Sequence, residues 1–350
     1  MAFSRKPFFI KLFNWEYWPF EVVYFPVFPV WIVLWLRARA IYFFNTSNPG
    51  IENGGMMNES KKDIHDIMPS DLYPRTIHFP RDIDHRKVCA AIASNGFRYP
   101  LFGKPDVGGR GRGVRKIKTE KELSEYASAA TIDFHIQEAV EFENEVGIFY
   151  YRYPGEESGR ITGIVKKEFL AVTGNGKQSI GDLILNDQRA IVYSESLKNT
   201  LGVEWHHIPG KGEKVIVSPY GNHARGSKFV DDSDKIDPSL TRAMDQITSR
   251  IRGFNFGRLD IRFRDWESLR NARDFMIIEV NGAGAEPTHM YDPEHSIIYA
   301  WKEIIRHWWI MTTVSIKNHK QGAPYLSLKE GKEMFRKYNV IRKQIKEITE

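Results

Sequence analysis

One stretch of the chain, residues 254–290, places acceptor side chains on two neighbouring strands. It has the sequence FNFGRLDIRFRDWESLRNARDFMIIEVNGAGAEPTHM and predicts two antiparallel strands joined by a polar excursion. Residues two apart on a strand point to the same face, so Glu279 and Asn281 project together. Asp260, in the neighbouring strand, completes a set of three oxygen ligands. Such hard oxygen donors suit Mg²⁺, which keeps its other positions for water and phosphate oxygens.

These carboxylates have a second interpretation, in which Asp260 and Glu279 simply pair with arginines. The neighbouring arginines are Arg258, Arg262 and Arg264. The run MIIEVN at 276–281 favours a metal, because it is an apolar strand that ends in two acceptors. The sequence therefore predicts that Asp260, Glu279 and Asn281 are metal ligands.

Length and charge limit the class of protein. The 350 residues give room for two or three domains that share a sizeable core. The net charge of +6 and the isoelectric point of about 9.1 allow an anionic partner, such as nucleotide, nucleic acid or acidic lipid, without choosing among them. A single cysteine, Cys89, excludes an internal disulfide and a thiolate metal cage, and a reducing compartment follows.

The first 44 residues are rich in aromatic side chains. Residues 22–36 carry no charge, but they are fewer than the about 20 that a spanning helix needs, and Pro26 and Pro29 interrupt them. Trp and Tyr favour the membrane–water interface, and Lys11 and Arg37 flank the run. Two interpretations stay open: an interfacial membrane segment, which we favour, and a hydrophobic hairpin packed on the protein.

A loop with turn sequences, residues 45–61, follows and is either a substrate loop or a connector.

A lysine followed by a glycine-rich hairpin comes next. Residues 99–105 (YPLFGKP) predict a strand that carries Lys104, and DVGGRGRGV at 106–114 leads into a second strand. Backbone amides of Gly108, Gly109, Gly111 and Gly113 can approach phosphate oxygens there, and the lysine adds a charge. Arginine–glycine tracts also bind RNA, but this one is short and lies between apolar strands, so no nucleic-acid partner is expected.

The order of these parts resembles the ATP-grasp superfamily, in particular carboxylate–amine ligases such as D-alanine–D-alanine ligase and cyanophycin synthetase. The segment GNGKQSIGDLI at 174–184 is similar to the GDGK motif of cyanophycin synthetase, with Asn175 in place of the usual aspartate. The resemblance covers roughly residues 80–310. It implies an α+β fold in which two subdomains sandwich ATP. The chain would then have three parts. They are an atypical, aromatic-rich segment 1–80, an ATP-grasp domain 81–315 whose two subdomains meet near residue 170, and a basic amphipathic C-terminal helix in 316–350.

The resemblance also implies roles for single residues. Lys104 and the loop 108–113 would contact the phosphates of ATP, and Glu145 the ribose. Two catalytic residues are also implied: Lys166 would reach the nucleotide, and Arg225 would contact the γ-phosphate. Asp260, Glu279 and Asn281 would hold Mg²⁺, with two ions expected. The adenine would be held by main-chain groups of the segment Gln137, Glu138, Ala139 and Val140.

The chemistry implied is ligation of a carboxylate to an amine. The carboxylate would attack the γ-phosphate of ATP to give an acyl phosphate and ADP, and an amine would then displace phosphate. Backbone N–H groups of the segment 282–284 (GAG) are expected to stabilise the tetrahedral intermediate. The N-terminal segment departs from the family pattern, so the acid and amine, small molecules or lipid-linked, are not implied. The alternative function is a non-catalytic nucleotide-binding module at a membrane surface. With either function, the protein is expected to be cytoplasmic or peripheral on the inner membrane face.

Overall fold

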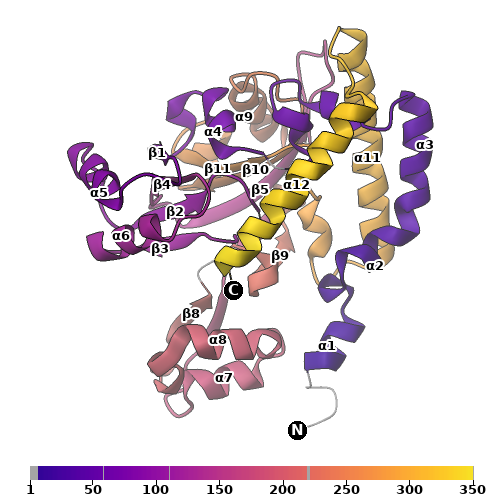
Figure 1. Ribbon diagram of the computed structural model, residues 1–350. Coiled ribbons are helices and arrows are strands. Elements are labelled where there is room, and N and C mark those ends of the chain that lie inside the picture. The colour runs from indigo at the N-terminus through magenta and orange to yellow at the C-terminus, as the bar shows by residue number, and fades with distance from the viewer. Residues whose placement is uncertain (1–6, 58, 110, 219–220, 350) are drawn as a thin grey trace. The chain divides into compact units, whose positions relative to one another are not determined.

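The computed structural model describes residues 7–57, 59–109, 111–218 and 221–349, and its elements can be followed along the chain in Figure 1. The chain forms two compact units, each built from three separate stretches. Unit 1 contains Met1–Pro29, Ile164–Asp234 and Thr288–Ile305, and unit 2 contains Val30–Gly163, Lys235–Pro287 and Arg306–Glu350. This partition by contacts differs from the contiguous domains expected from the sequence, which stay a prediction.

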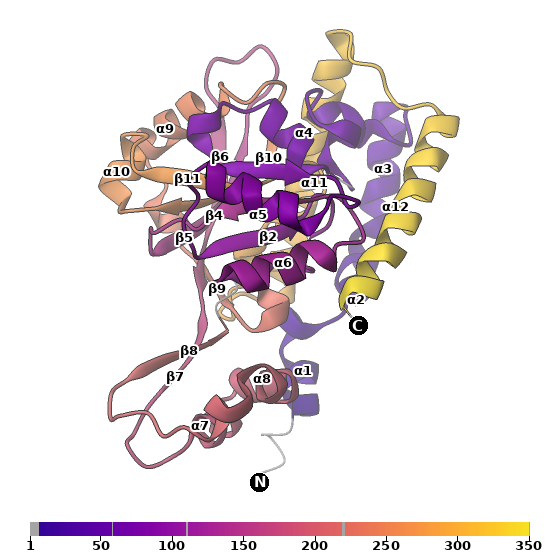
Figure 2. The ribbon, with the colours of Figure 1, turned by 60° about the vertical axis from the view of Figure 1, so that its left-hand side comes forward.

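Unit 2 contains a four-stranded antiparallel sheet in the order β1-β4-β2-β3. Its strands are β1 (Thr76–Phe79), β2 (Leu101–Pro105), β3 (Arg115–Ile117) and β4 (Phe134–Glu138). Residues of β4 alternate, so Phe134 and Ile136 enter an apolar core while His135 and Gln137 point to the other face. Two helices, α5 (His85–Ser94) and α6 (Glu120–Ser128), cover the core face (Figure 2).

The helices of this sheet begin with side-chain caps. Thr119 caps α6, because its Oγ1 accepts a hydrogen bond from the backbone N–H of Glu122 at 3.2 Å. Asp84 caps α5 in the same way, accepting from the N–H of Arg86 at 2.8 Å. Side-chain caps of this kind satisfy amide donors that have no partner within the helix.

A second sheet in unit 2 contains the two strands predicted from residues 254–290. They are β10 (Phe256–Phe263) and β11 (Phe275–Asn281), and the short helix α10 (Trp266–Arg270) lies in the excursion between them. β10 pairs with β5 (Asn144–Tyr151) on its other side, and β6 (Arg160–Glu168), which continues into unit 1, follows β5. The helix α9 (Pro238–Thr248) also belongs to this unit.

Aromatic and aliphatic residues far apart in the sequence form the second core of unit 2. Phe43 and Phe44 are buried together with Phe149 of β5, Phe256 of β10 and Met311. Three helices contribute to this core: α3 (Phe28–Ala38), α11 (Ile297–Lys320), which starts in unit 1, and α12 (Leu328–Thr349). The predicted C-terminal helix is thus α12, whereas residue 316, where a boundary is predicted, lies inside α11.

The loop 45–57 is held by its backbone and by one asparagine. The side chain of Asn48 is fully buried, donates to the carbonyls of Gly54 and Phe256 at 2.8 Å, and accepts from the N–H groups of Asn255 and Phe256. Gly54 has φ of 67°, a left-handed conformation that favours glycine. The loop is therefore an integral part of unit 2.

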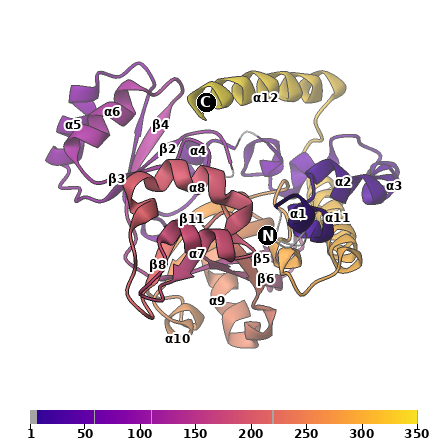
Figure 3. The same ribbon diagram turned by 90° about the horizontal axis from the view of Figure 1, so that it is seen from below.

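Unit 1 has a smaller apolar core around the pair of strands β7 (Leu170–Thr173) and β8 (Lys214–Ser218). The helices α7 (Ile180–Asn186) and α8 (Ser194–Leu201) pack against these strands (Figure 3). Unit 1 also contains the helices α1 (Pro7–Phe13) and α2 (Phe20–Tyr24) and the strand β9 (Lys228–Asp231), which pairs with the end of β6. The helix α4 (Lys61–Asp66) belongs to unit 2.

The aromatic N-terminal segment forms helices. Residues Phe20–Ala38 contain α2 and α3 and are 19 residues long with a mean hydropathy of 1.5, which by length and composition is enough to cross a membrane. Only 17% of this window is buried. The helical span is thus longer than the uncharged run that the sequence indicates.

Candidate functional site

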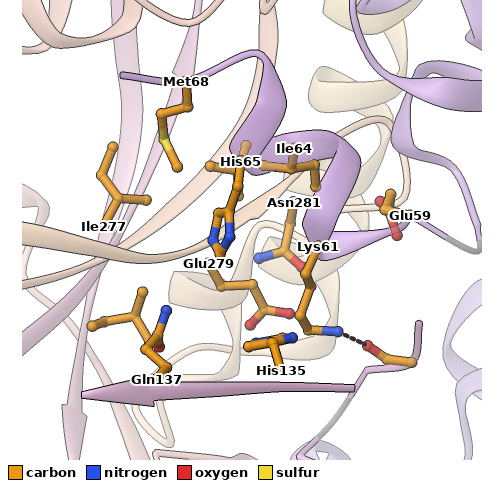
Figure 4. Close-up of a pocket in the computed structure, with 13 residues that line it drawn as sticks. Glu59, Lys61, Ile64, His65, Met68, His135, Gln137, Ile277, Glu279 and Asn281 are labelled. Carbon is orange, nitrogen blue, oxygen red and sulfur yellow. Dashed lines mark hydrogen bonds between the residues drawn. The ribbon is translucent and has the colours of Figure 1, made fainter. Parts of the chain in front are cut away.

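A narrow pocket in unit 2 gathers charged and polar side chains from three elements (Figure 4). Its walls are strand β4, strand β11 and the segment that contains α4, and the space it encloses is about 30 Å³. The polar lining residues are Glu59, Lys61, His65, His135, Gln137, Glu279 and Asn281. Two acidic and one basic side chain thus share a small space with two imidazoles.

The first wall carries the predicted nucleotide lysine. Lys104 on β2 and His135 on β4 are cross-strand partners, so their side chains share the face opposite the apolar core. The Nζ of Lys104 donates to Oε1 of Gln137 at 2.6 Å, and Gln137 donates through Nε2 to Oγ1 of Thr76 at 2.9 Å. Burial lowers the pKa of Lys104 to about 8, while the charge of Glu279 opposes that shift. A buried cation supported mainly by a neutral amide is a favourable place for an anionic ligand.

The second wall carries the predicted metal ligands. The register pairs Asp260 with Glu279 and Arg258 with Asn281, with an irregularity directly after Asp260. Glu279 and Asn281 line the pocket. Asp260 is buried and accepts from Nε of Arg258 at 2.8 Å, as the second interpretation of this carboxylate expects. The strand pairing therefore brings the three residues together, while an arginine binds one of them.

The chemistry of this wall fits a magnesium ion. Asp260, Glu279 and Asn281 can supply hard oxygen atoms, of which both oxygens of Asp260 accept from Arg258, at 2.8 and 3.4 Å. The Nδ2 of Asn281 is buried and has no hydrogen-bond partner among the residues that the structure describes. A buried polar atom without a partner costs about 1–3 kcal/mol, and because this amide nitrogen is a donor, an anionic oxygen of a ligand, not the metal, would recover that cost.

Two residues of the pocket, Glu59 and Lys61, were not predicted from the sequence to act in the site. Burial raises the pKa of Glu59 to about 7, and the charge of Glu279 adds to the shift. Burial lowers the pKa of Lys61, which the nearby acidic groups oppose. They stand at the end of the predicted loop 45–61, but only the fold brings them to β11, so no local pattern marks them.

The glycine-rich hairpin joins β2 to β3 as predicted. Gly108, Gly111 and Gly113 all have positive φ, at 130°, 68° and 69°, which only glycine adopts readily. Lys61 donates through Nζ to the carbonyls of Asp106 and Gly108, both at 3.1 Å, and so holds the start of the hairpin. Gly109 has open space around it, and Arg110 lies outside the described residues.

Side chains near the predicted adenine and ribose contacts bind two arginines. Glu138 accepts from Arg75 at 3.1 Å, and Glu145 accepts from Nε of Arg262 at 3.1 Å. Arg262 also donates through Nη1 to the carbonyl of Val140 at 3.2 Å. Glu138 ends β4 of one sheet and Glu145 lies on β5 of the other, with Val140 in the link between them, and the roles of these groups and of Ala139 stay predictions.

The two predicted catalytic residues belong to unit 1. Lys166 on β6 is exposed and pairs with Glu168 at 3.2 Å. Arg225 ends a short 3₁₀ turn, His223–Arg225. Their action on ATP stays a prediction.

The expectation that the segment 282–284 offers N–H groups to an intermediate is wrong. The N–H of Ala283 donates to the carbonyl of Gly54 at 2.9 Å, and that of Gly284 donates to the carbonyl of Gly55 at 2.8 Å. A Cβ on Gly282 would lie within 2.8 Å of the Cα of Gly55, so the two backbones are in close contact. These amides hold the loop 45–57 and are not available to a substrate.

Comparisons with known proteins find ligases. No family model matches the chain. The sequence is 24% identical over 206 residues to the glutathione biosynthesis bifunctional protein of Clostridium perfringens (strain 13 / Type A). The match covers 54% of this chain and 26% of that protein. The chain thus spans about a quarter of the length of the curated relative it matches.

Solved structures that are similar in part include two more ligases. D-alanine–D-alanine ligase from Bacillus anthracis is 13% identical with a TM-score of 0.41, covering 77% of this chain and 72% of the other. A bifunctional glutathione synthetase from Pasteurella multocida is 16% identical with a TM-score of 0.35, covering 69% and 36%. The sheets and helices of both units confirm the α+β class.

Proposed function

We propose that this protein is an ATP- and Mg²⁺-dependent ligase that joins a carboxylate to an amine and releases ADP and phosphate. The observation that carries the proposal is the pocket of unit 2, where Glu279 and Asn281 lie near Gln137, the residue that Lys104 binds. Cations beside hard oxygen donors are what phosphoryl transfer requires, because charge builds up on the transferred group. The partial similarity to ligases supports the same class.

The chain's own residues would act on charge and water. Lys104 would exchange its bond to Gln137 for an oxygen of the nucleotide, and Glu279 and Asn281, with Asp260, would hold the metal. When bound, Mg²⁺ neutralises charge on the phosphates and orients them. Lys61 would keep the glycine-rich hairpin over the phosphates, and so protect an acyl phosphate from hydrolysis.

The remaining assignments belong to the same proposal. Lys166 and Arg225 would stabilise the transferred phosphoryl group, and the segment 137–140 with Glu145 would hold adenine and ribose. Two magnesium ions and either small or lipid-linked acids and amines are consistent with this chemistry.

Product analysis tests the proposed reaction. Purified protein is incubated with ATP, Mg²⁺ and a panel of acids and amines, and ADP and phosphate are measured. Equal amounts of both are expected, and hydroxylamine should trap an acyl hydroxamate, because the acyl phosphate is attacked by any strong amine nucleophile. Release of AMP and pyrophosphate would overturn the proposal. ATP binding without turnover on any acid or amine would instead favour a non-catalytic nucleotide-binding module.

We also propose that the N-terminal helices hold the protein at a membrane surface. Large apolar side chains remain exposed there: Phe8, Phe13, Phe25 and Leu36 have exposed fractions of 67%, 78%, 79% and 74%. Exposed apolar surface on this scale marks a binding surface. Purified protein should co-sediment with anionic vesicles, and removal of residues 1–38 should abolish this co-sedimentation. If the same fraction of the full-length protein sediments with and without vesicles, the proposal is contradicted.

A further inference from the structure

Three imidazoles, two of which line the pocket, have no part in the proposed reaction. His78 on β1 and His135 on β4 are cross-strand partners, so both rings lie on the face that carries Lys104. His65 of α4 joins them, since its Nδ1 lies 3.1 Å from Nε2 of His78, and its ring stacks on Tyr73 with centroids 4.0 Å apart. Three histidines from three elements thus meet on one face of the sheet.

A carboxylate completes the cluster. Asp106 directly follows β2, and its Oδ1 accepts from the backbone N–H of Lys62 at 2.9 Å, which fixes the side chain. One ring nitrogen of His78, one of His135 and one carboxylate oxygen of Asp106 all lie within 4.8 Å of one another. Ligands of one ion each lie about 2.0–2.2 Å from it and so at most about 4.4 Å from one another, which means that the three atoms would move slightly closer together around a bound ion.

Two nitrogens of the cluster lack a hydrogen-bond partner in the described part of the chain. They are Nδ1 of His135, whose residue is 1% exposed, and Nδ1 of His78. His78 bonds to His65 through its other nitrogen, Nε2. Each buried nitrogen without a partner is unfavourable, and two of them in one cluster indicate a missing ligand.

Hydrogen bonding inside the cluster resembles that around a metal. A metal-bound histidine commonly bonds through its second ring nitrogen to a neighbour, which fixes the ring and the tautomer. His65 is placed to do this for His78, and Tyr73 fixes the ring of His65 in turn.

We propose that His78, His135 and Asp106 bind one divalent transition-metal ion of the Zn²⁺ class. Two imidazoles and one carboxylate form a nitrogen–oxygen set that suits Zn²⁺ or Co²⁺, whereas Mg²⁺ prefers oxygen ligands alone. The ion ties β1 and β4 to the residue that begins the glycine-rich hairpin. It therefore fixes the position of that hairpin independently of the magnesium ligands on β11.

Metal binding by untagged, metal-stripped protein tests the site. Titration with Zn²⁺ is followed by calorimetry in the presence of excess Mg²⁺, and Co²⁺ is added separately as a spectroscopic probe. One equivalent of Zn²⁺ is expected, and Co²⁺ should give a visible absorption band of low-symmetry nitrogen–oxygen coordination. Neither readout depends on ATP, so the result is separate from that of the ligase assay.

Variants locate the bound ion. His78→Gln and Asp106→Asn should each weaken Zn²⁺ binding by at least about 10-fold. The matched control His206→Gln, at an exposed histidine of unit 1, should bind like the wild type. Circular dichroism establishes that each variant is folded. Absence of stoichiometric Zn²⁺ binding by the wild type, or equal affinity in all three variants, would overturn the proposal, and neither outcome requires a variant to fold.

Discussion

The pocket of unit 2 and a buried charge cluster of unit 1 contain similar groups but satisfy them differently. In unit 1, Glu16 accepts two hydrogen bonds from Arg189, at 2.7 and 3.2 Å, and contacts Nε2 of His223 at 2.8 Å. Arg189 uses its third nitrogen, Nε, on the carbonyl of Gly226 at 3.1 Å. In the pocket, by contrast, buried nitrogens of Asn281 and His135 lack partners among the described residues.

The difference separates a structural cluster from a binding site. In the cluster of unit 1, two hydrogen bonds from Arg189 and the contact with His223 act on one carboxylate, so the cluster holds chain segments together. Buried polar groups with unused capacity are unfavourable in the free protein, and that cost is recovered only when a ligand binds. We therefore assign the cluster around Glu16 to stability and the pocket to function.

The largest expected effect is the loss of the carboxylate in unit 1. Glu16→Ala leaves Arg189 and His223 without their anion, and breaking a buried pair in this way costs about 3–5 kcal/mol in the free energy of unfolding. Urea denaturation measures it. The control Asp66→Ala removes an exposed pair with Lys62 and should change stability little. Equal stability of the two variants would show that the cluster around Glu16 is not structural.

Next in size is the loss of a carboxylate from the pocket. Glu279→Gln should reduce ATP turnover by about 100–1,000-fold, because it removes a metal-ligand charge that faces phosphate. Its free energy of unfolding should change by less than about 1 kcal/mol, since the group serves a ligand more than the fold. The control Glu267→Gln, on an exposed side of α10, should keep wild-type turnover. Wild-type turnover of Glu279→Gln across a Mg²⁺ titration would remove Glu279 from the metal site.

The smallest expected effect is a dependence of stability on pH. Burial raises the pKa of Glu59 from about 4.5 to about 7, so the folded protein holds a proton that the unfolded chain releases. Its contribution to stability is fully present below about pH 4.5 and is lost as pH rises through about 7, and it amounts to at most about 3 kcal/mol.

Glu59→Gln tests this contribution, because the amide cannot titrate. Urea denaturation of wild type and variant at about pH 5 and about pH 8 should show that the variant loses less stability with rising pH. An identical pH dependence in both proteins would mean that Glu59 is not a titrating group of the pocket.

The sequence predicts much of the scaffold of the site. The strands around Asp260 and Glu279 form and pair in register, and the hairpin after Lys104 has the glycines that its positive φ angles require. These features follow from patterns within a few residues: alternation of apolar side chains, turn residues and helix caps. Local patterns are therefore sufficient for this part of the site.

The parts that the sequence does not predict depend on contacts between distant segments. Strand β1 is four residues long and lies between prolines, so only its pairing with β4 identifies it. Glu59, Lys61 and His65 enter the pocket because tertiary contacts place their segment there. The wrong expectation for residues 282–284 has the same origin, since their N–H groups bind carbonyls of Gly54 and Gly55.

That last contact has a consequence for how the protein is made in the cell. The loop 45–57 leaves the ribosome early, but the backbone groups that hold it, at residues 282–284, are synthesised more than two hundred residues later. At ordinary rates of translation the interval is about 10–50 s. During this time Phe43 and Phe44 also lack the partners on α11 that bury them. The nascent chain therefore carries exposed aromatic residues through most of its synthesis, and unit 2 closes only when nearly the whole polypeptide has emerged.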